Sequence, residues 1–304
     1  MATRDEPNWE TWRSFLAVMT EGSLSAAARK LALTQPTLGR HIDQLEADLG
    51  TALFSRSQTG LLPTQAAREL LPHAQAMASA ADAAVRAASG TGAEERGSVR
   101  LTASVVIGGE VLPPLLTSFH EKHPHIAIEL VLSDVSADLL RRDADIAVRM
   151  VRPKQDALVA RRIGRIGLGL HAHRRYLEKH GTPQSLDDLT RHSVMGFDKE
   201  TQVAQALRRM GLTLGREMFA LRTDADLALL AALRAGYGIS ICQYGIARRD
   251  PDLVPVLPGA IKFELEMWLA MHKDLRGTRR MRLLFDHLAE GLAAYAAISR
   301  PRER

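Results

Sequence analysis

The sequence has little or none of several features that define whole classes of protein. Its 304 residues include one cysteine, Cys242, so neither an internal disulfide nor a cysteine-based zinc site is expected. Long apolar runs are missing, since the run from Leu227 to Leu233 ends at Arg234, far short of a membrane span. The first residues lack the apolar centre of a signal peptide. We therefore expect a cytoplasmic protein without a membrane segment.

A strong excess of charge at the N-terminus is missing as well. The formal net charge is +5 and the sequence pI is about 9.6. Residues 1–90 nevertheless carry eight Lys and Arg against nine Asp and Glu, and the basic excess lies later in the chain. Charge alone would misplace a nucleic-acid site, so the pattern of residues has to locate it.

Motifs of common enzyme classes are also missing from the sequence. Ile107-Gly108-Gly109 is no dinucleotide fingerprint, and there is no Walker loop or nucleophile elbow. The pairs His123-Pro-His125 and His171-Ala-His173 have no acidic or cysteine partner at metal-ligand spacing. We expect no enzymatic activity, no metal and no cofactor, and interpret Cys242 as an inert core thiol.

Residues 8–62 have the pattern of a compact helical unit followed by a hairpin. Apolar residues recur at helical spacing from Trp9 to Met19. Thr34 stands as the N-cap of a later helix that Gly50 ends. Leucine-containing segments flank the turn residues 58–60. Two helices joined by a tight turn and followed by a hairpin form a winged helix-turn-helix.

Residues 64–89 predict one long alanine-rich helix. A regular apolar seam runs along it: Leu70, Ala74, Met77, Ala81, Ala84 and Ala88. Small residues in such a seam let two helices approach closely, which favours a dimer. The alternative is a linker helix that packs only on its own chain. Residues 89–92 then predict a flexible joint.

From Gly97 onward, strand and helix patterns alternate, including a helix predicted over 202–210. Such alternation is typical of parallel sheets covered by helices, and about 200 residues of it favour two small α/β lobes over one large sheet. Paired arginines are interpreted as solvated faces or subunit contacts: Arg161-Arg162, Arg174-Arg175 and Arg279-Arg280.

The motifs of the N-terminal unit closely resemble the DNA-binding domain of LysR-type transcriptional regulators. They are Thr34-Gln35-Pro36 with Arg40, Leu45-Glu46 with Leu49-Gly50, and Leu53-Phe54 with Arg56. Weaker matches, such as Asp145 to Arg149 and Gly236 to Ile239, follow in the family's order.

The resemblance implies a fold of three parts. These are a winged helix-turn-helix DNA-binding domain at 1–63, a dimerisation linker helix at 64–91, and an effector-binding domain at 92–304. The effector domain is expected to be a two-lobed, type II periplasmic-binding-protein-like α/β fold. Lobe I would cover about 97–165 and 270–300, and lobe II about 166–269.

The resemblance also implies which residues contact DNA: Ser25, Thr34, Gln35, Pro36, Thr37, Arg40 and Arg56. The side-chain chemistry agrees, since Gln pairs with adenine, the Thr methyl contacts thymine, and Arg binds guanine or phosphate. Ser25 and Thr34 suit phosphate, although each has an alternative role as a helix cap, which we favour for Thr34. Gly39 stands where the family usually has Ser, which removes one hydroxyl from this surface.

A small-molecule effector is expected beyond the carboxyl ends of the strands. The candidate residues are Ser104, Val105, Arg149 and Thr223. Hydroxyls at helix N-termini and an arginine suit a small anion, whereas an internal salt bridge is the alternative role for Arg149.

The expected partners follow from the same resemblance. They are double-stranded DNA with an interrupted inverted repeat, the effector, further copies of the chain in a dimer of dimers, and RNA polymerase. Two other classes stay open, namely a solute-binding protein and an enzyme with a cleft between two lobes. The solute-binding protein predicts an export signal and leaves residues 8–62 unexplained, and the enzyme predicts a catalytic constellation that the sequence does not offer.

Overall fold

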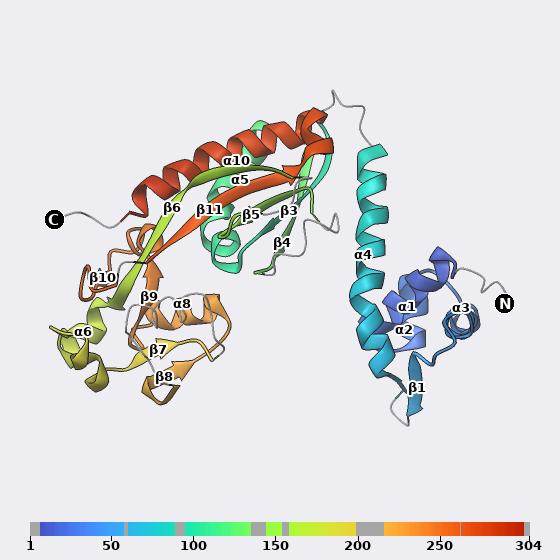
Figure 1. Cartoon of the computed structure of the whole chain (residues 1–304), viewed down its shortest axis with the longest axis horizontal. Helices are drawn as coiled ribbons and strands as arrows, with labels where there is room; N and C mark the ends of the chain where they lie inside the picture. The colour runs from blue at the N-terminus through green and yellow to red at the C-terminus, as the bar shows by residue number, and fades with distance from the viewer. Residues whose placement is uncertain are drawn as a thin grey trace. The chain divides into compact units, whose positions relative to one another are not determined.

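Figure 1 shows the chain as a computed structural model that describes residues 7–57, 60–88, 95–134, 144–153, 158–198, 216–261 and 263–300. Its contacts divide the chain into two compact units, the first formed mainly by residues 1–87. Each unit has a hydrophobic core of its own. The helix predicted over 202–210, the joint predicted over 89–92, and residues 58 and 59 of the predicted turn lie outside the described residues.

Three helices open the first unit: α1 (Trp9–Glu21), α2 (Leu24–Lys30) and α3 (Gln35–Leu49). Polar side chains accept a backbone N–H at the start of each helix: Asn8, Ser23 and Thr34. Gly22 and Gly50 end α1 and α3 with φ of 72° and 66°. Glycine adopts this left-handed conformation without a steric penalty, so the sequence itself sets where these helices stop.

The core of the first unit is built on the inner faces of these helices. Phe15, Leu38 and Leu45 are each 0% exposed. The ring of Phe15 contacts those of Trp12 and Phe54, with centroids 6.1 Å and 5.8 Å apart. The buried faces of α1 and α3 therefore hold this unit together.

A two-stranded hairpin follows α3. Strands β1 (Phe54–Ser57) and β2 (Gly60–Pro63) pair antiparallel. Glu46 joins α3 to the hairpin, because its Oε1 accepts the backbone N–H groups of Leu53 at 2.6 Å and Phe54 at 3.0 Å. Charge-assisted bonds of this kind fix where the hairpin leaves the helix.

The long helix α4 (Gln65–Ala88) has two different environments along its length. Ala67 and Ala74 are 0% exposed and belong to the core of the first unit, whereas Met77 is 41% and Val85 68% exposed. The first members of the predicted dimer seam are thus covered by their own chain, because α4 packs on the helical unit there. An intermolecular seam would have to begin at about Met77.

Nine strands form one sheet in the second unit, in the order β4-β3-β5-β11-β6-β9-β7-β8, with β10 paired to β6. The strands are β3 (Gly97–Ala103), β4 (Ile126–Leu132), β5 (Ile146–Arg149), β6 (Leu158–His173), β7 (Val194–Gly196), β8 (Phe219–Arg222), β9 (Ile239–Gln243), β10 (Leu253–Pro255) and β11 (Phe263–His272). β3 pairs parallel with β4 and β5, and β7 with β8 and β9.

The long strand β6 joins the two lobes. It pairs antiparallel with β11 over much of its length and with β9 and β10 at its C-terminal end. A large core lies under β3, β5 and β11, and a smaller one lies around β9 and β10. The two-lobed α/β fold is confirmed, but the strands of both lobes belong to one sheet, which the sequence pattern did not favour, because β6 pairs with strands of each lobe.

The helices of the second unit cover the sheet. They are the π-helix η1 (Ile107–Val111), α5 (Leu112–Lys122), α6 (Arg174–His180), α8 (Asp226–Arg234), α9 (Tyr244–Ala247) and α10 (Arg279–Ile298), with 3₁₀ turns η3 (Asp187–Arg191), η4 (Arg216–Met218) and η5 (Lys273–Gly277). Figure 1 shows α10 running along β6 and β11, which it also contacts.

One of the paired arginines lies in the interior, contrary to the prediction of a solvated face. Arg280 is 1% exposed, and its Nε donates to the carbonyl of Ser98 at 3.3 Å. The first turn of α10 lies against the start of β3, where the guanidinium passes close to the α-carbon of Gly97. The prediction failed because a local pattern cannot show that this helix start is covered by a strand far away in the sequence.

Candidate functional site

The N-terminal end of α3 presents polar side chains on its outer face. Gln35, Pro36 and Arg40 are exposed and Thr37 is partly exposed, while the opposite face of the helix fills the core. Arg40 has no ion-pair partner among the residues that the structure describes. A helix end with exposed donors and acceptors over a rigid core has the form of a surface that reads base edges in the major groove.

Three hydrogen bonds hold the polar side chains at this helix end. The Oγ of Ser25 on α2 donates to Oε1 of Gln35 at 3.0 Å. Thr34 caps α3 by accepting the N–H of Thr37 at 3.3 Å, and the two threonine hydroxyls lie 2.8 Å apart. The capping role favoured for Thr34 is confirmed, and its contact with DNA stays a prediction.

Three further positions lie on or near the predicted DNA-binding surface: His41, Gly39 and Arg56. The Oγ of Ser14 lies 2.8 Å from Nδ1 of His41, which gives this histidine an intramolecular role between α1 and α3. A side chain at Gly39 would meet no atom within 4 Å, so the absent hydroxyl is not forced by packing. Arg56 lies on β1, and its side chain is outside the described part of the chain.

The structure brings several of the predicted effector residues together at the carboxyl ends of β3 and β5. Ser104 follows β3 and is 8% exposed, and its hydroxyl has no hydrogen-bond partner within the described part of the chain. Arg149 ends the neighbouring strand β5 and is 4% exposed, and its Nη2 donates to the hydroxyl of Thr102 at 2.9 Å. Arg149 is thus held within the sheet, and its pairing with a carboxylate of the effector stays a prediction.

Carboxylates that the sequence did not single out lie beside these residues. Oδ1 of Asp134 accepts the N–H of Val105 at 3.2 Å. Asp134 and Asp224 act electrostatically on Asp226 in the first turn of α8. Thr223 lies just before them, and its hydroxyl accepts the N–H of Ala225 at 3.1 Å. Two backbone amides that could receive an anion here, those of Val105 and Ala225, therefore already have intramolecular acceptors.

An ion pair joins α8 to the π-helix η1. Both terminal nitrogens of Arg234 donate to the carboxylate of Glu110 at 2.7 Å, and Arg249 donates to the carbonyl of Glu110 at 2.9 Å. The guanidinium of Arg234 beside Glu110 lowers the pKa of that carboxyl. This bidentate pair fixes the position of α8 against the segment that follows β3.

Both units match descriptions of one family of bacterial proteins. Residues 9–68 match "Bacterial regulatory helix-turn-helix protein, lysR family", and residues 92–293 match "LysR substrate binding domain". The chain belongs to the LysR family of transcriptional regulators. The helix-turn-helix is thus the DNA-binding domain of a LysR-type regulator, and the two-lobed unit is its effector-binding domain.

Relatives of this LysR-type regulator support the assignment over its length. It is 28% identical over 291 residues to the "Probable HTH-type transcriptional regulator LtrA" of Klebsiella pneumoniae, covering 93% of this chain and 94% of that protein. It is 32% identical over 190 residues to the regulator CrgA of Neisseria meningitidis serogroup C, covering 62% of this chain and 64% of that protein.

Solved structures of the family have the same fold. The structure of CrgA from Neisseria meningitidis aligns with a TM-score of 0.59 at 26% identity, covering 94% of this chain and 99% of that one. The structure of CbnR aligns with a TM-score of 0.65 at 22% identity, covering 93% of this chain and 99% of that one, and supports the fold alone. The regulator class is confirmed.

Three further observations concern the cysteine, the helices and the metal-binding residue types of this LysR-type regulator. Cys242 is 5% exposed, and burial raises the pKa of its thiol to about 12, which keeps the thiol protonated and unreactive. No helix in the described ranges is long and apolar enough to cross a membrane. Among the same residues, no three His, Cys, Asp or Glu side chains are grouped as a metal site would require.

The Asp226 carboxyl makes a pH-dependent contribution to the stability of this LysR-type regulator. Burial, and then the nearby Asp134 and Asp224, raise its pKa from 3.8 to about 6. Because the folded state favours the protonated form, stability falls as pH rises from about 4 through about 6. Asp226→Asn should increase the free energy of unfolding at pH 7 by about 1–2 kcal/mol, a value reduced for partial exposure.

Denaturant unfolding of both proteins at pH 4 and pH 7 checks this prediction. The two curves should coincide at pH 4 and separate at pH 7. Asp187→Asn, at an exposed position on η3, is the matched control and should give no gain. An equal difference between Asp226→Asn and the unsubstituted protein at both pH values would contradict the assignment.

Proposed function

We propose that this regulator binds an interrupted inverted repeat in double-stranded DNA through the N-terminal end of α3. The observation that carries the proposal is the exposure of Gln35 while Ser25 holds its amide oxygen at 3.0 Å. An amide fixed in this way is pre-oriented for a base edge, so less side-chain entropy is lost on binding. Pro36 would lie against the base edges or the sugar-phosphate backbone.

The neighbouring side chains would complete the interface. Thr37 offers its methyl group to thymine, and Arg40 binds guanine or phosphate. Thr34 can donate its hydroxyl proton to a phosphate oxygen, Ser25 would do so only after releasing Gln35, and Arg56 on the hairpin would bind the backbone. Contacts to phosphate position the protein, while Gln35 and Arg40 would supply sequence preference.

The sites on two chains would be linked through α4. Met77 and Val85 are exposed apolar residues on the part of α4 that its own core leaves uncovered, and burial against a second α4 would remove them from water. Two such dimers would associate through the effector-binding domains. The assembly would act in the cytoplasm, where it has access to the chromosome and to RNA polymerase, and it would act by binding rather than catalysis.

A small molecule would bind at the strand ends around Ser104, Val105, Arg149 and Thr223. The carboxylates of Asp134 and Asp226 lie at this place, so we propose an effector that presents hydrogen-bond donors or positive charge to them and a carboxylate to Arg149. Binding would favour one arrangement of the lobes and so change the spacing of the DNA-binding domains.

Selection of genomic DNA fragments by the purified protein, at a stated salt concentration, tests the proposed function. An enriched inverted repeat is the expected result, since each half would be read by one α3 of a dimer. Binding without sequence preference at every salt concentration would contradict the proposal, because phosphate contacts alone carry no sequence information.

Gln35→Ala should weaken binding to the selected repeat by about 1–3 kcal/mol and relax the preference at one base pair of each half. Ser25→Ala should act in the same direction with a smaller effect, because it removes the hydroxyl that holds the side-chain amide of Gln35. Titration of labelled repeats with each base changed in turn measures both effects.

Gln44→Ala is the matched control for the change at Gln35. Gln44 lies on the same helix, is exposed, and bonds to Asp48 at 2.6 Å instead of facing the N-terminal end. It should leave affinity and preference unchanged. Retained preference in Gln35→Ala would remove Gln35 from base recognition.

A further inference from the structure

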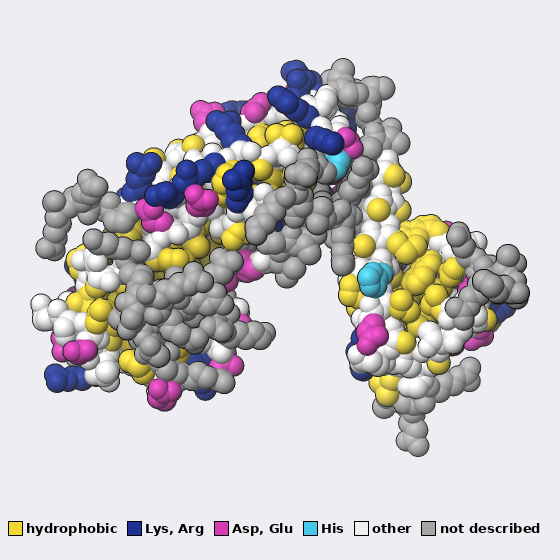
Figure 2. All heavy atoms as spheres, viewed as in Figure 1, with side chains coloured by type: hydrophobic (Ala, Val, Ile, Leu, Met, Phe, Trp, Pro, Cys, Tyr) yellow, Lys and Arg dark blue, Asp and Glu magenta, His cyan; other side chains and the backbone are white. Residues whose placement is uncertain are grey.

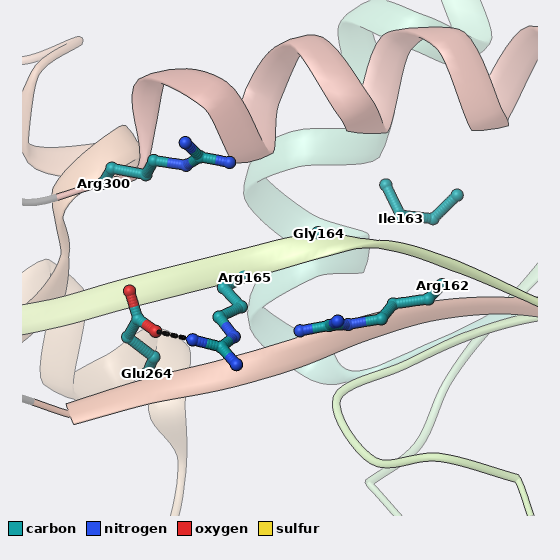
Figure 3. A pocket seen from close by; sticks show the side chains of 6 residues that line it. All are labelled: Arg162, Ile163, Gly164, Arg165, Glu264 and Arg300. Carbon is teal, nitrogen blue, oxygen red and sulfur yellow. Dashed lines mark hydrogen bonds and ion pairs between the residues drawn. The ribbon is translucent and has the colours of Figure 1, made fainter.

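A polar hollow lies on the second unit where β6 and β11 pass the end of α10. Its volume is about 570 Å³, and it is lined by Arg162, Ile163, Gly164, Arg165, Glu264 and Arg300. Figure 3 shows Arg162 extended toward Arg165, whose guanidinium turns to Glu264, while Arg300 lies across β6 from them, beside α10. This volume is within the range of about 300–1,000 Å³ that is typical of small-molecule sites.

A β-bulge places two of these arginines on one face. The pairing of β6 with β11 shifts register between Met267 and Trp268. Arg165 pairs with Glu264 at 3.3 Å, and Arg162 pairs with Glu266 at 2.9 Å. The two glutamates are two residues apart on β11 and therefore share a face, so the two arginines share it as well. In a regular strand, residues three apart would point to opposite faces.

The third arginine is held in place by its backbone. The carbonyl of Arg300 accepts a hydrogen bond from Arg248 at 2.7 Å, and Arg248 also donates to the carbonyl of Ile298. The intervening Ser299 is 0% exposed. The end of α10 is therefore anchored, and the guanidinium of Arg300 has no acidic partner among the residues that the structure describes.

The floor of the hollow depends on close packing between α10 and β6. A Cβ atom at Gly164 would lie 2.7 Å from the Cβ of Ala296 on α10, so a glycine is needed for this approach. Figure 2 shows Lys and Arg side chains gathered over this part of the unit with acidic side chains between them. Among the described residues around the hollow there are three guanidinium groups and two carboxylates, which is a local excess of positive charge.

We infer that this hollow is a second ligand site, separate from the strand ends around Ser104, and that it binds a small metabolite through a phosphate or carboxylate group. Guanidinium groups bind such oxyanions through two parallel hydrogen bonds, and three arginines line this hollow. Glu264 acts as a built-in competitor, since the ligand replaces it as the partner of Arg165. DNA does not fit, because Glu264 and Glu266 would repel a continuous row of phosphates.

Calorimetric titration of the full-length protein with pyrophosphate and with citrate, at constant ionic strength, tests the inference. At least one of these anions should bind. Binding of pyrophosphate alone supports a phosphate ester as the ligand, and binding of citrate alone supports a carboxylate. Arg300→Gln and Arg165→Gln should each weaken binding about tenfold, as expected for loss of one charge-assisted contact.

Glu264→Gln should instead strengthen binding several-fold, because it removes the competing carboxylate. Arg191→Gln on η3 and Glu178→Gln on α6 change the charge equally at other exposed positions and should leave binding unchanged. Absence of binding by both anions would overturn the inference. So would equal weakening by Arg191→Gln, which would show a general charge effect without a built site.

Discussion

Met77→Asp is expected to halve the mass of the assembly and to weaken binding to the full inverted repeat by about two to four orders of magnitude. Met77 lies on α4, 41% exposed, just beyond the residues that this helix buries against its own unit. A carboxylate there would be desolvated between two helices. The affinity is lost because two linked half-site contacts become independent, which removes the gain from effective concentration.

Sedimentation velocity measures the mass, and titration with whole and half repeats separates assembly from recognition. Affinity for a half repeat should be unchanged, since α3 and its core are untouched. Gln75→Asp introduces the same charge at an exposed position two residues away on another face of α4, and it should leave mass and affinity intact. An unchanged mass in Met77→Asp would place the dimer contact elsewhere.

The DNA-binding unit could be predicted in detail because its determinants are local. Thr34 and Gly50 mark the ends of α3, and the apolar stripe between them specifies one buried face. The sequence pattern did not show the side-chain hydrogen bonds that join one helix to another or to the hairpin. Ser25 bonds to Gln35, ten residues away, and Glu46 bonds to the start of the hairpin. Such contacts depend on tertiary packing and have no periodic signal.

The second unit was less predictable because its main strand has no strand-like pattern. β6 carries exposed arginines in its first half and a fully buried run after them, so neither alternation nor one apolar run covers its 16 residues. The burial of Arg280 and the carboxylate cluster around Asp226 also depend on segments far apart in the sequence. The contact residues proposed for DNA and for the effector stay predictions that binding measurements must test.

Phe15→Ala should destabilise the DNA-binding unit by about 3–5 kcal/mol, which is the usual cost of removing a fully buried aromatic side chain. The ring is 0% exposed and contacts Trp12 and Phe54, so its loss opens a cavity between α1 and the start of the hairpin. Domains of this size are stable by only about 5–15 kcal/mol. DNA binding should therefore fall steeply on warming.

Hydrogen exchange of peptides from the two units separates this loss from general unfolding. Peptides from α1 and α3 should exchange much faster in Phe15→Ala, while those from β3 and α10 keep their protection, because the two cores are separate. Phe15→Leu keeps most of the buried volume and should cost only about 1 kcal/mol. If peptides from α3 exchanged equally slowly in Phe15→Ala and Phe15→Leu, the Phe15 ring would not be what holds the recognition helix in place.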